Sequence, residues 1–263
     1  MIATGRFNMA RSISFVITMA AVVFLVVPIL VIFPLSLTDQ RFLSFPKEAI
    51  SFDHYAKLLS DPRWLRSITS SLMISTTSAA VATLLGTFCA VALWSNRSGW
   101  ILRLAVILFL PLFVPGVLHA LSLYWLWVQF GLLDTFPALV ISHTVLTLPL
   151  AIITVSASLS QIDYSLYRSA VSLGASDWKA TTRIILPNAK LGIFAGFVLC
   201  FITSWDEVVA TNFIAGRTWR TVPLQLWSGL RERVDPSVAA LSVLLILATV
   251  ILIFLVRPWR RIS

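Results

Sequence analysis

The sequence predicts an all-α integral membrane protein with six transmembrane helices. Hydrophobic residues make up 58% of the 263 residues, charged residues make up 12%, and the mean hydropathy is +0.91. Soluble domains do not reach such values. Apolar runs of about 20 residues, the length that a helix needs to cross a bilayer, recur along the chain between short polar segments. A single transmembrane domain, residues 1–263, accounts for the whole length.

Six apolar segments give the expected spans: residues 13–37, 67–94, 104–128, 136–159, 191–215 and 237–256. The first is longer than the apolar region of a signal peptide and lacks a cleavage pattern, so we interpret it as an uncleaved span. The second is rich in Ser, Thr and Ala and contains Gly86, a composition typical of close helix packing. The sixth is almost wholly aliphatic, and we expect it to face lipid.

The polar segment between the first two spans, residues 38–66, has an amphipathic pattern. Phe52, Tyr55, Leu58 and Leu59 have the spacing of one face of a short helix on the outer surface, and we expect Trp64 to lie near the headgroups. Two interpretations stay open for this segment. It is either a solvated loop or a contact surface for an external binding protein.

The third span contains Pro111, Pro115 and Gly116, which predict a kink beside an interior path. Three aromatic residues follow the kink: Tyr124, Trp125 and Trp127. An interfacial aromatic belt is the favoured interpretation of these residues, and a place for Tyr124 on the substrate path is the alternative.

The fourth span contains His143, for which a hydrogen bond between helices is favoured over a role in a translocation pathway. The fifth span contains Trp205, Asp206 and Glu207 between apolar neighbours. A carboxylate at the centre of a bilayer costs about 2.5–3.5 kcal/mol on insertion scales, so two adjacent ones indicate a function. Successive helical residues point about 100° apart. We therefore expect one acid to line the path and the other to meet a partner helix, unless both lie where the path widens to water.

The distribution of charge sets the orientation. One side of the membrane carries eleven of the Lys and Arg residues against two acids: Arg6, Arg11, Arg97, Arg103, Arg168, Lys179, Arg183, Lys190, Arg257, Arg260 and Arg261 against Asp163 and Asp177. The other side offsets its cations with seven acids. The positive-inside bias places the first side, and both termini, in the cytoplasm. The net charge of +9 therefore indicates membrane topology, and no nucleic-acid partner is expected.

Residues 161–190 form a polar and basic island between the fourth and fifth spans. Asp163 is a candidate N-cap, Gly174 suits the left-handed residue that ends a helix, and Ser176 or Asp177 supplies a second N-cap. Pro187 is expected to end the second helix because it lacks an N–H. The pattern predicts two short helices meeting at a corner, with an ordinary interfacial linker as the alternative.

The spacing in this island resembles the cytoplasmic loop of permease subunits in type I ABC importers. Gly174, followed after a gap by Ile184-Ile185-Leu186-Pro187, matches the family signature of Glu-Ala-Ala, three residues, Gly, nine residues, and Ile-x-Leu-Pro. One departure is plain, since the signature Glu falls on Arg168 and the two alanines on Ser169 and Ala170. The resemblance implies a coupling loop that docks on a separate ATPase through Arg168, Ala170, Gly174, Ala175, Ser176, Asp177, Leu186 and Pro187.

The resemblance extends from about residue 110 to the C-terminus. Ser142-His143 and residues 204–209 are similar to the second permease subunit of spermidine/putrescine importers. The resemblance implies that the chain is a bacterial inner membrane protein. It also implies four kinds of contact, with the bilayer, a second permease, two ATPase copies and a periplasmic binding protein. A polyamine would interact favourably with Trp205, Asp206 and Glu207, and His143 and Tyr124 are the other candidates for its path. Another small solute is the alternative substrate.

Several other classes of chemistry have no signature here. The chain contains no Gly-x-x-x-x-Gly-Lys-[Ser/Thr] motif, so we expect a transport subunit without an ATPase site of its own. Cys89 and Cys200 lie in apolar segments and have no zinc spacing, and no cofactor, metal or catalytic residue is expected. Trp178 stands where a nucleophile elbow needs its second Gly, which leaves a membrane hydrolase as a weak hypothesis. An ion-coupled carrier using Asp206 and Glu207 is the other alternative.

Overall fold

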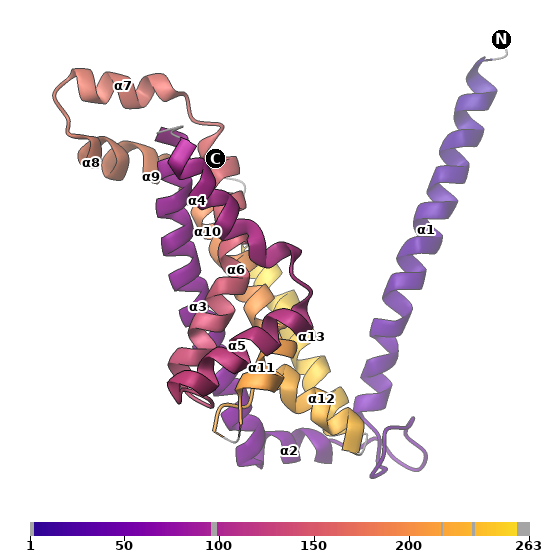
Figure 1. The fold of residues 1–263 in the computed structure, drawn as a ribbon. Helices are drawn as coiled ribbons and strands as arrows, with labels where there is room; N and C mark the ends of the chain where they lie inside the picture. The colour runs from indigo at the N-terminus through magenta and orange to yellow at the C-terminus, as the bar shows by residue number, and fades with distance from the viewer. Residues whose placement is uncertain (1–2, 96–98, 217, 233–234, 257–263) are drawn as a thin grey trace. The chain divides into compact units, whose positions relative to one another are not determined.

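The computed structural model describes residues 3–95, 99–216, 218–232 and 235–256, and the elements in these ranges are helical (Figure 1). The chain divides into two compact units, residues 1–65 with 228–263 and residues 66–227. The first unit contains α1 (Ala3–Ser36), α2 (Asp53–Ser60), the start of α3 (Pro62–Ser95) and α13 (Ser237–Val256). α12 (Val222–Glu232) begins in the second unit and ends in the first.

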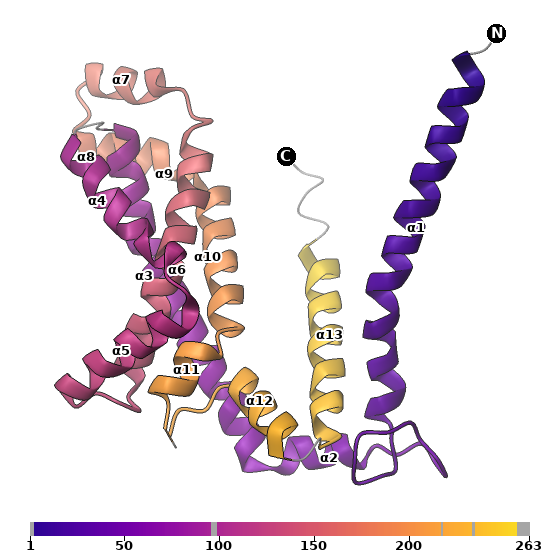
Figure 2. The same cartoon turned by 45° about the vertical axis from the view of Figure 1, so that its right-hand side comes forward.

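The second unit contains most of α3, α4 (Gly99–Phe109), the 3-10 turn η1 (Leu110–Phe113), α5 (Gly116–Phe130) and α6 (Phe136–Leu159). It continues with α7 (Tyr164–Ser172), α8 (Asp177–Ala180), the π-turn η2 (Thr181–Ile185) and α9 (Leu186–Asn188). α10 (Lys190–Trp205) and α11 (Val209–Ile214) follow. Figure 2 shows α3, α6 and α10 running side by side, with α7 to α9 projecting beyond their ends.

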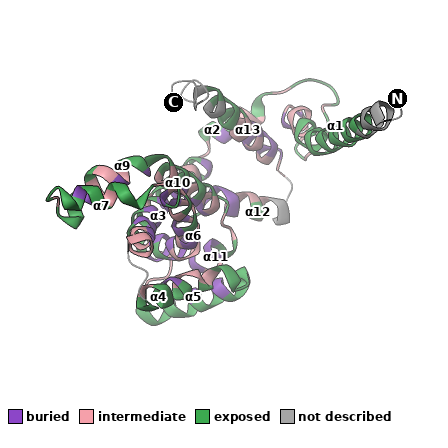
Figure 3. Cartoon of the chain, turned by 90° about the horizontal axis from the view of Figure 1, so that it is seen from above, coloured by how far each residue is buried: buried purple, intermediate pink, exposed green. Residues whose placement is uncertain are grey.

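α6 is the central helix of the second unit. Ile74, Trp127, Leu139 and Ile214 bring α3, α5, α6 and α11 into one buried cluster. Small residues set the spacing, because a Cβ built on Gly86 would lie 2.6 Å from that of Ala151 on α6. Gly192 on α10 lies similarly close to Ser158 of α6. The close packing expected for the second span is confirmed, and Figure 3 shows the buried residues concentrated on α3 and α6.

Three helices are long and apolar enough to cross a membrane on their own: Arg11–Ser36, Pro62–Ser95 and Phe136–Leu159. Two bent pairs raise the number to as many as five, and Ser237–Ile251 is a shorter apolar helix. These findings cover only the described residues. Helices therefore occur at each expected span, while the count of six stays a prediction.

Two expected spans are broken rather than continuous. The kink predicted at Pro111, Pro115 and Gly116 is confirmed, but its angle is 108°, between Gly99–Phe113 and Gly116–Phe130. In the fifth expected span, α10 ends at Trp205 and α11 begins at Val209. The expectation of one continuous span over residues 191–215 is therefore wrong. Prolines remove backbone donors at the first break. At the second break, polar side chains replace the helical hydrogen bonds, as described below.

Two expectations about exposed residues are wrong, those for Trp127 and for the last helix, α13. Trp127 is buried, and its indole N–H donates to the Ser142 Oγ at 2.8 Å. It therefore does not belong to an interfacial belt. Trp125, by contrast, is exposed. Trp64 is also buried within the protein, and its place near the headgroups stays a prediction. α13 does not face outward along its whole length. Its first turns are buried at Ala239–Leu241, and only its later turns are exposed.

Candidate functional site

The projecting loop between α6 and α10 is built around a helical corner. Asp163 Oδ1 accepts the N–H of Ser165 at 2.8 Å, and this hydrogen bond lowers the pKa of the Asp163 carboxyl. Asp163 is therefore the N-cap of α7, as predicted. The exposed position of the cap keeps the carboxylate in water, so its main effect is to fix where the helix starts.

α7 ends in a Schellman motif centred on Gly174. The N–H of Gly174 bonds the carbonyl of Val171 at 2.9 Å, and the N–H of Ala175 bonds that of Ala170 at 3.1 Å. Gly174 has φ +90°, a left-handed backbone conformation that residues with a Cβ rarely adopt. No atom lies within 4 Å of a Cβ built there, so backbone conformation alone explains the glycine.

The two arms of the corner are joined by one side-chain hydrogen bond. The Tyr167 hydroxyl on α7 donates to Asp177 Oδ1 at the start of α8, at 2.9 Å. This bond to a carboxylate raises the pKa of Tyr167. Ser176 is the N-cap of α8, and its hydroxyl accepts the N–H of Lys179 at 3.4 Å. Of the two N-cap candidates, Ser176 takes the cap, and Asp177 holds the arms together.

The base of the loop packs against the ends of α3 and α6. The Trp94 ring at the end of α3 contacts Tyr164 and Tyr167 edge-on, with ring centroids 5.0 and 6.0 Å apart. Ile185 of η2 is fully buried with Leu159 of α6. Because both arms of the loop are packed in this way, a displacement of the corner would be transmitted to α3 and α6.

Pro187 marks the end of the second arm to within one residue, as the sequence predicted. The helical run continues to Asn188, and the chain bends by 70° between Asp177–Asn188 and Lys190–Trp205. The turn just before Pro187 widens into a π-helix, in which the Leu186 N–H bonds the carbonyl of Thr181. Since Pro187 has no N–H and its ring crowds the preceding turn, the wider turn accommodates it within the helix.

The predicted coupling residues lie on this loop at different depths. Arg168, Gly174, Ser176, Asp177 and Pro187 are exposed, Ala175 and Leu186 are half-buried, and Ala170 is buried. Two large apolar side chains, Leu173 and Trp178, are exposed by 89% and 67% at the tip. The loop thus presents apolar anchors and charged groups together, which is the composition of a protein contact surface.

The second candidate site is the break between α10 and α11. The Glu207 carboxylate accepts the N–H of Ala210 at 2.7 Å and thereby caps the first turn of α11, within the apolar segment. Asp206 follows the last residue of α10 and is exposed, whereas Glu207 is half-buried. The break therefore separates the two adjacent acids, giving one an open position and the other a structural partner.

Buried polar residues surround this break. His143 is completely buried, with its Nδ1 2.8 Å from the Ser204 hydroxyl and its Nε2 3.0 Å from the Thr211 hydroxyl. It thereby joins α6 to α10 and α11, in agreement with the favoured hydrogen-bonding interpretation. The other path candidates lie nearby, with the Trp205 ring centroid 5.9 Å from that of Phe201 and Tyr124 6.5 Å from Phe213.

Sequence reasoning missed a clasp formed by Asp134. Its carboxylate accepts the N–H groups of Gly216, Thr218 and Trp219 at 2.9–3.3 Å, and its own N–H bonds the carbonyl of Ile214. Asp134 is the one non-glycine residue with positive φ, at 56°, in the part of the chain that the structure describes. The clasp fixes the segment after α11. An Asp in a short turn was the signal available in the sequence.

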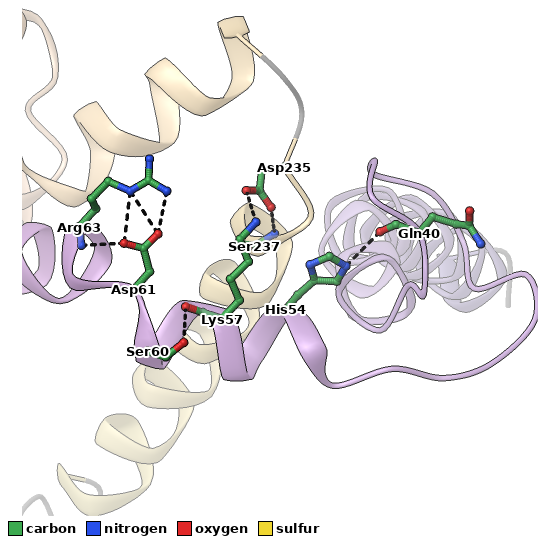
Figure 4. Close-up of polar contacts among 8 residues, drawn as sticks. All are labelled: Gln40, His54, Lys57, Ser60, Asp61, Arg63, Asp235 and Ser237. Carbon is green, nitrogen blue, oxygen red and sulfur yellow. Dashed lines mark hydrogen bonds and ion pairs between the residues drawn. The ribbon is translucent and has the colours of Figure 1, made fainter.

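The first unit carries a polar cluster in its non-spanning segments (Figure 4). Lys57 of α2 pairs with Asp235 at 3.1 Å, and Arg63 pairs with Asp61 at 2.8 Å (Figure 4). The hydrogen bonds from Arg63 lower the pKa of Asp61. At Asp235, partial burial raises the pKa of the carboxyl, but its hydrogen bonds with Ser237 and Lys57 lower it by more, so the pKa is lowered overall. Figure 4 also shows His54 bonding the Gln40 carbonyl, which ties α2 to the preceding loop.

Among the described residues, no group of three His, Cys, Asp or Glu side chains is placed to hold a metal ion. A bundle of apolar helices with a projecting helical corner between two of them defines a membrane transport subunit of the permease class. Residues 82–262 match the family model described as binding-protein-dependent transport system inner membrane component. The chain belongs to this family.

Two curated relatives carry descriptions of polyamine transport. The spermidine/putrescine transport system permease protein PotC of Escherichia coli (strain K12) is 30% identical over 230 residues, which cover 88% of this chain and 87% of PotC. The putrescine transport system permease protein PotI of the same strain is 29% identical over 203 residues, covering 73% and 71%.

A solved bacterial alginate ABC transporter, in complex with alginate pentasaccharide-bound periplasmic protein, contains a similar chain. The TM-score is 0.74 at 21% identity, with 98% of this chain and 96% of that chain covered. This likeness shows the fold, that of a type I ABC importer permease.

Proposed function

We propose that this chain is the membrane-spanning subunit of an ATP-driven importer and that the helical corner of the loop between α6 and α10 docks on a separate ATPase. The observation that carries the proposal is the Gly174 corner, which projects from the bundle and exposes Leu173 and Trp178. Family membership supports the same conclusion. The corner would move with the ATPase during its nucleotide cycle and thereby shift the permease between its two access states.

The path from the corner to the spans runs through its base. On the α7 side, Tyr164 and Tyr167 press on Trp94 of α3. On the η2 side, Ile185 packs on Leu159 of α6. α6 in turn packs closely along α10, whose end carries the break at Asp206 and Glu207. A push on the loop would therefore reach the polar break through packed helices.

The proposed membrane arrangement has six spans with both termini in the cytoplasm. Support comes from the three long apolar helices, the bent pair Gly99–Phe113 with Gly116–Phe130, α10 and α13, together with the excess of Lys and Arg on the side of the loop. The membrane would be the bacterial inner membrane. A hydrophobic face for lipid or a sister subunit is available on α5, where Leu118, Leu121 and Trp125 are exposed.

The proposed partners are two copies of an ATPase, a second permease and a periplasmic binding protein. The family description includes dependence on a binding protein, and the solved alginate transporter includes a periplasmic protein. We propose a heterodimeric pairing with the second permease. The polar segments around α2, which Lys57 and Asp235 hold together, form a candidate contact for the binding protein.

We propose a small organic solute as substrate, with a polyamine as the first choice. The relatives described for spermidine and putrescine support this choice. The exposed carboxylate of Asp206 and the ring of Trp205 lie at the helix break, where both would favour an ammonium group. Glu207 has a capping bond at one oxygen, which leaves its second oxygen for a ligand.

Uptake by cells that express the complete system tests the substrate. Competition of labelled spermidine with putrescine, an amino acid and a disaccharide ranks the solute classes. The polyamine proposal expects competition only by polyamines. Competition by the disaccharide instead would retain the permease function and replace the solute.

A further inference from the structure

The outer face of α7 carries an arginine with no protein partner. Arg168 is exposed, and within the described part of the chain no hydrogen bond or ion pair reaches its guanidinium. Arg63, by contrast, pairs with Asp61 at 2.8 Å. An arginine offers five N–H donors in a planar fork that fits a carboxylate with two hydrogen bonds.

The surroundings of Arg168 supply further donors. An open hollow on α7 is lined by Ser165, Arg168, Ser169, Ser172 and Leu173, a lining without an acid. Ser169 and Ser172 lie within about one helical turn of the arginine, so their hydroxyls can add hydrogen bonds to an anion bound by the guanidinium. Within the described residues no hydrogen bond engages the hydroxyls of Ser169 and Ser172, whereas the Ser165 hydroxyl bonds the Asp163 carboxylate.

The acids of the loop are already engaged. The Asp163 carboxylate caps α7, and the Asp177 carboxylate accepts the Tyr167 hydroxyl. The loop therefore presents its basic side chains to an incoming surface. Beside the hollow, Leu173 is 89% exposed and can fill an apolar depression. A charged group with an apolar anchor next to it is the composition of an interface hot spot.

We propose that this face of α7, with Arg168 and Leu173 as its two anchors, binds a carboxylate and an adjacent apolar depression on the ATPase. The inference rests on the proposed function and adds the chemistry of the contact. Anionic lipid headgroups are the competing occupant. The protein is favoured because α7 lies at the far end of the projecting loop, beyond the ends of α3 and α6 (Figure 1). Lys190, by contrast, is the first residue of α10.

The test compares two charge reversals of equal size. The permease pair is purified in detergent and titrated with the ATPase encoded beside it, using unmodified protein, Arg168→Glu and the matched control Lys190→Glu. We expect the Kd of Arg168→Glu to rise at least about tenfold, because a like charge opposes the carboxylate, and that of Lys190→Glu to change less than about twofold. Changing the responsible ATPase acid to Lys should restore the affinity of Arg168→Glu.

Three results would overturn the inference. Arg168→Glu with a Kd within about twofold of the unmodified protein removes the contact. Equal weakening by Arg168→Glu and Lys190→Glu points to general charge rather than a specific pair. Normal ATPase binding by Arg168→Glu, combined with lost attachment of the loop to vesicles of anionic lipid, assigns the face to headgroups. If the unmodified permease pair does not bind the ATPase at all, the proposed function itself fails.

Discussion

Replacement of Gly174 by alanine isolates the backbone contribution to coupling. Gly174 has φ +90°, and a Cβ built there meets no atom within 4 Å, so the alanine is strained by conformation and not by a clash. A left-handed residue with a Cβ costs about 1–2 kcal/mol. Since 1.4 kcal/mol is a factor of ten, this penalty disfavours the native corner by roughly 5- to 30-fold.

Asparagine provides a graded comparison, because it tolerates the left-handed region better than alanine. We therefore expect solute-stimulated ATPase activity and uptake to fall in the order Gly174, Gly174→Asn, Gly174→Ala. The assay uses the complete transporter in proteoliposomes, with the amount of inserted permease measured for each variant.

Gly131 supplies a matched control for left-handed strain outside the loop. It ends α5 with φ +64° and also has open space at its Cβ position, so Gly131→Ala carries a similar local penalty. We expect Gly131→Ala to lower stability while keeping the ratio of uptake to stimulated ATPase activity. Wild-type stimulation and uptake in Gly174→Ala would refute the reasoning, because the corner would then not need its observed geometry.

Three further predictions concern other parts of the chain. Asp206→Asn or Glu207→Gln should lower polyamine uptake more than it lowers ATPase assembly, because each removes a carboxylate charge, while the amide oxygen of Glu207→Gln can still accept the Ala210 N–H; unchanged uptake in both variants removes the cation proposal. Asp177→Asn should lower the raised pKa of Tyr167 toward its ordinary value of 10.0 in an absorbance titration. The hydrogen bond contributes its full stability below the pKa that Tyr167 has in the unfolded chain, and this stability is lost as the pH rises through the raised pKa of the folded chain. A Tyr167 pKa that is the same in Asp177→Asn and in the unmodified protein would argue against the bond. A cysteine at Ser176 should react only with reagent added from the cytoplasm, and labelling from outside would reverse the orientation.

Local signals in the sequence predicted the loop because its structure depends on near neighbours. The Asp163 cap and the left-handed Gly174 are each set by residues within five positions. The break in the third span likewise follows from Pro111 and Pro115, which act on their own turn. Only the size of the bend, 108°, required the structure.

Features that depend on distant partners were not predictable. Hydropathy counts residues 191–215 as one run, but α10 ends at Trp205 and α11 begins at Val209, where His143 of α6 bonds Ser204 and Thr211 on the two sides of the break. Trp127 is buried because Ser142 accepts its indole N–H, and no local pattern identifies that partner. The side-chain bonds of the Asp134 clasp join residues 82 or more positions apart, so no short motif in the sequence reveals them.

Nucleotide dependence of transport in a defined membrane tests the central claim most directly. The purified chain would be placed in proteoliposomes with its sister permease, and solute movement would be measured with and without the ATPase, MgATP and the binding protein. The account predicts accumulation only when all of these components are present. Accumulation by the chain alone, driven by an ion gradient, would contradict it.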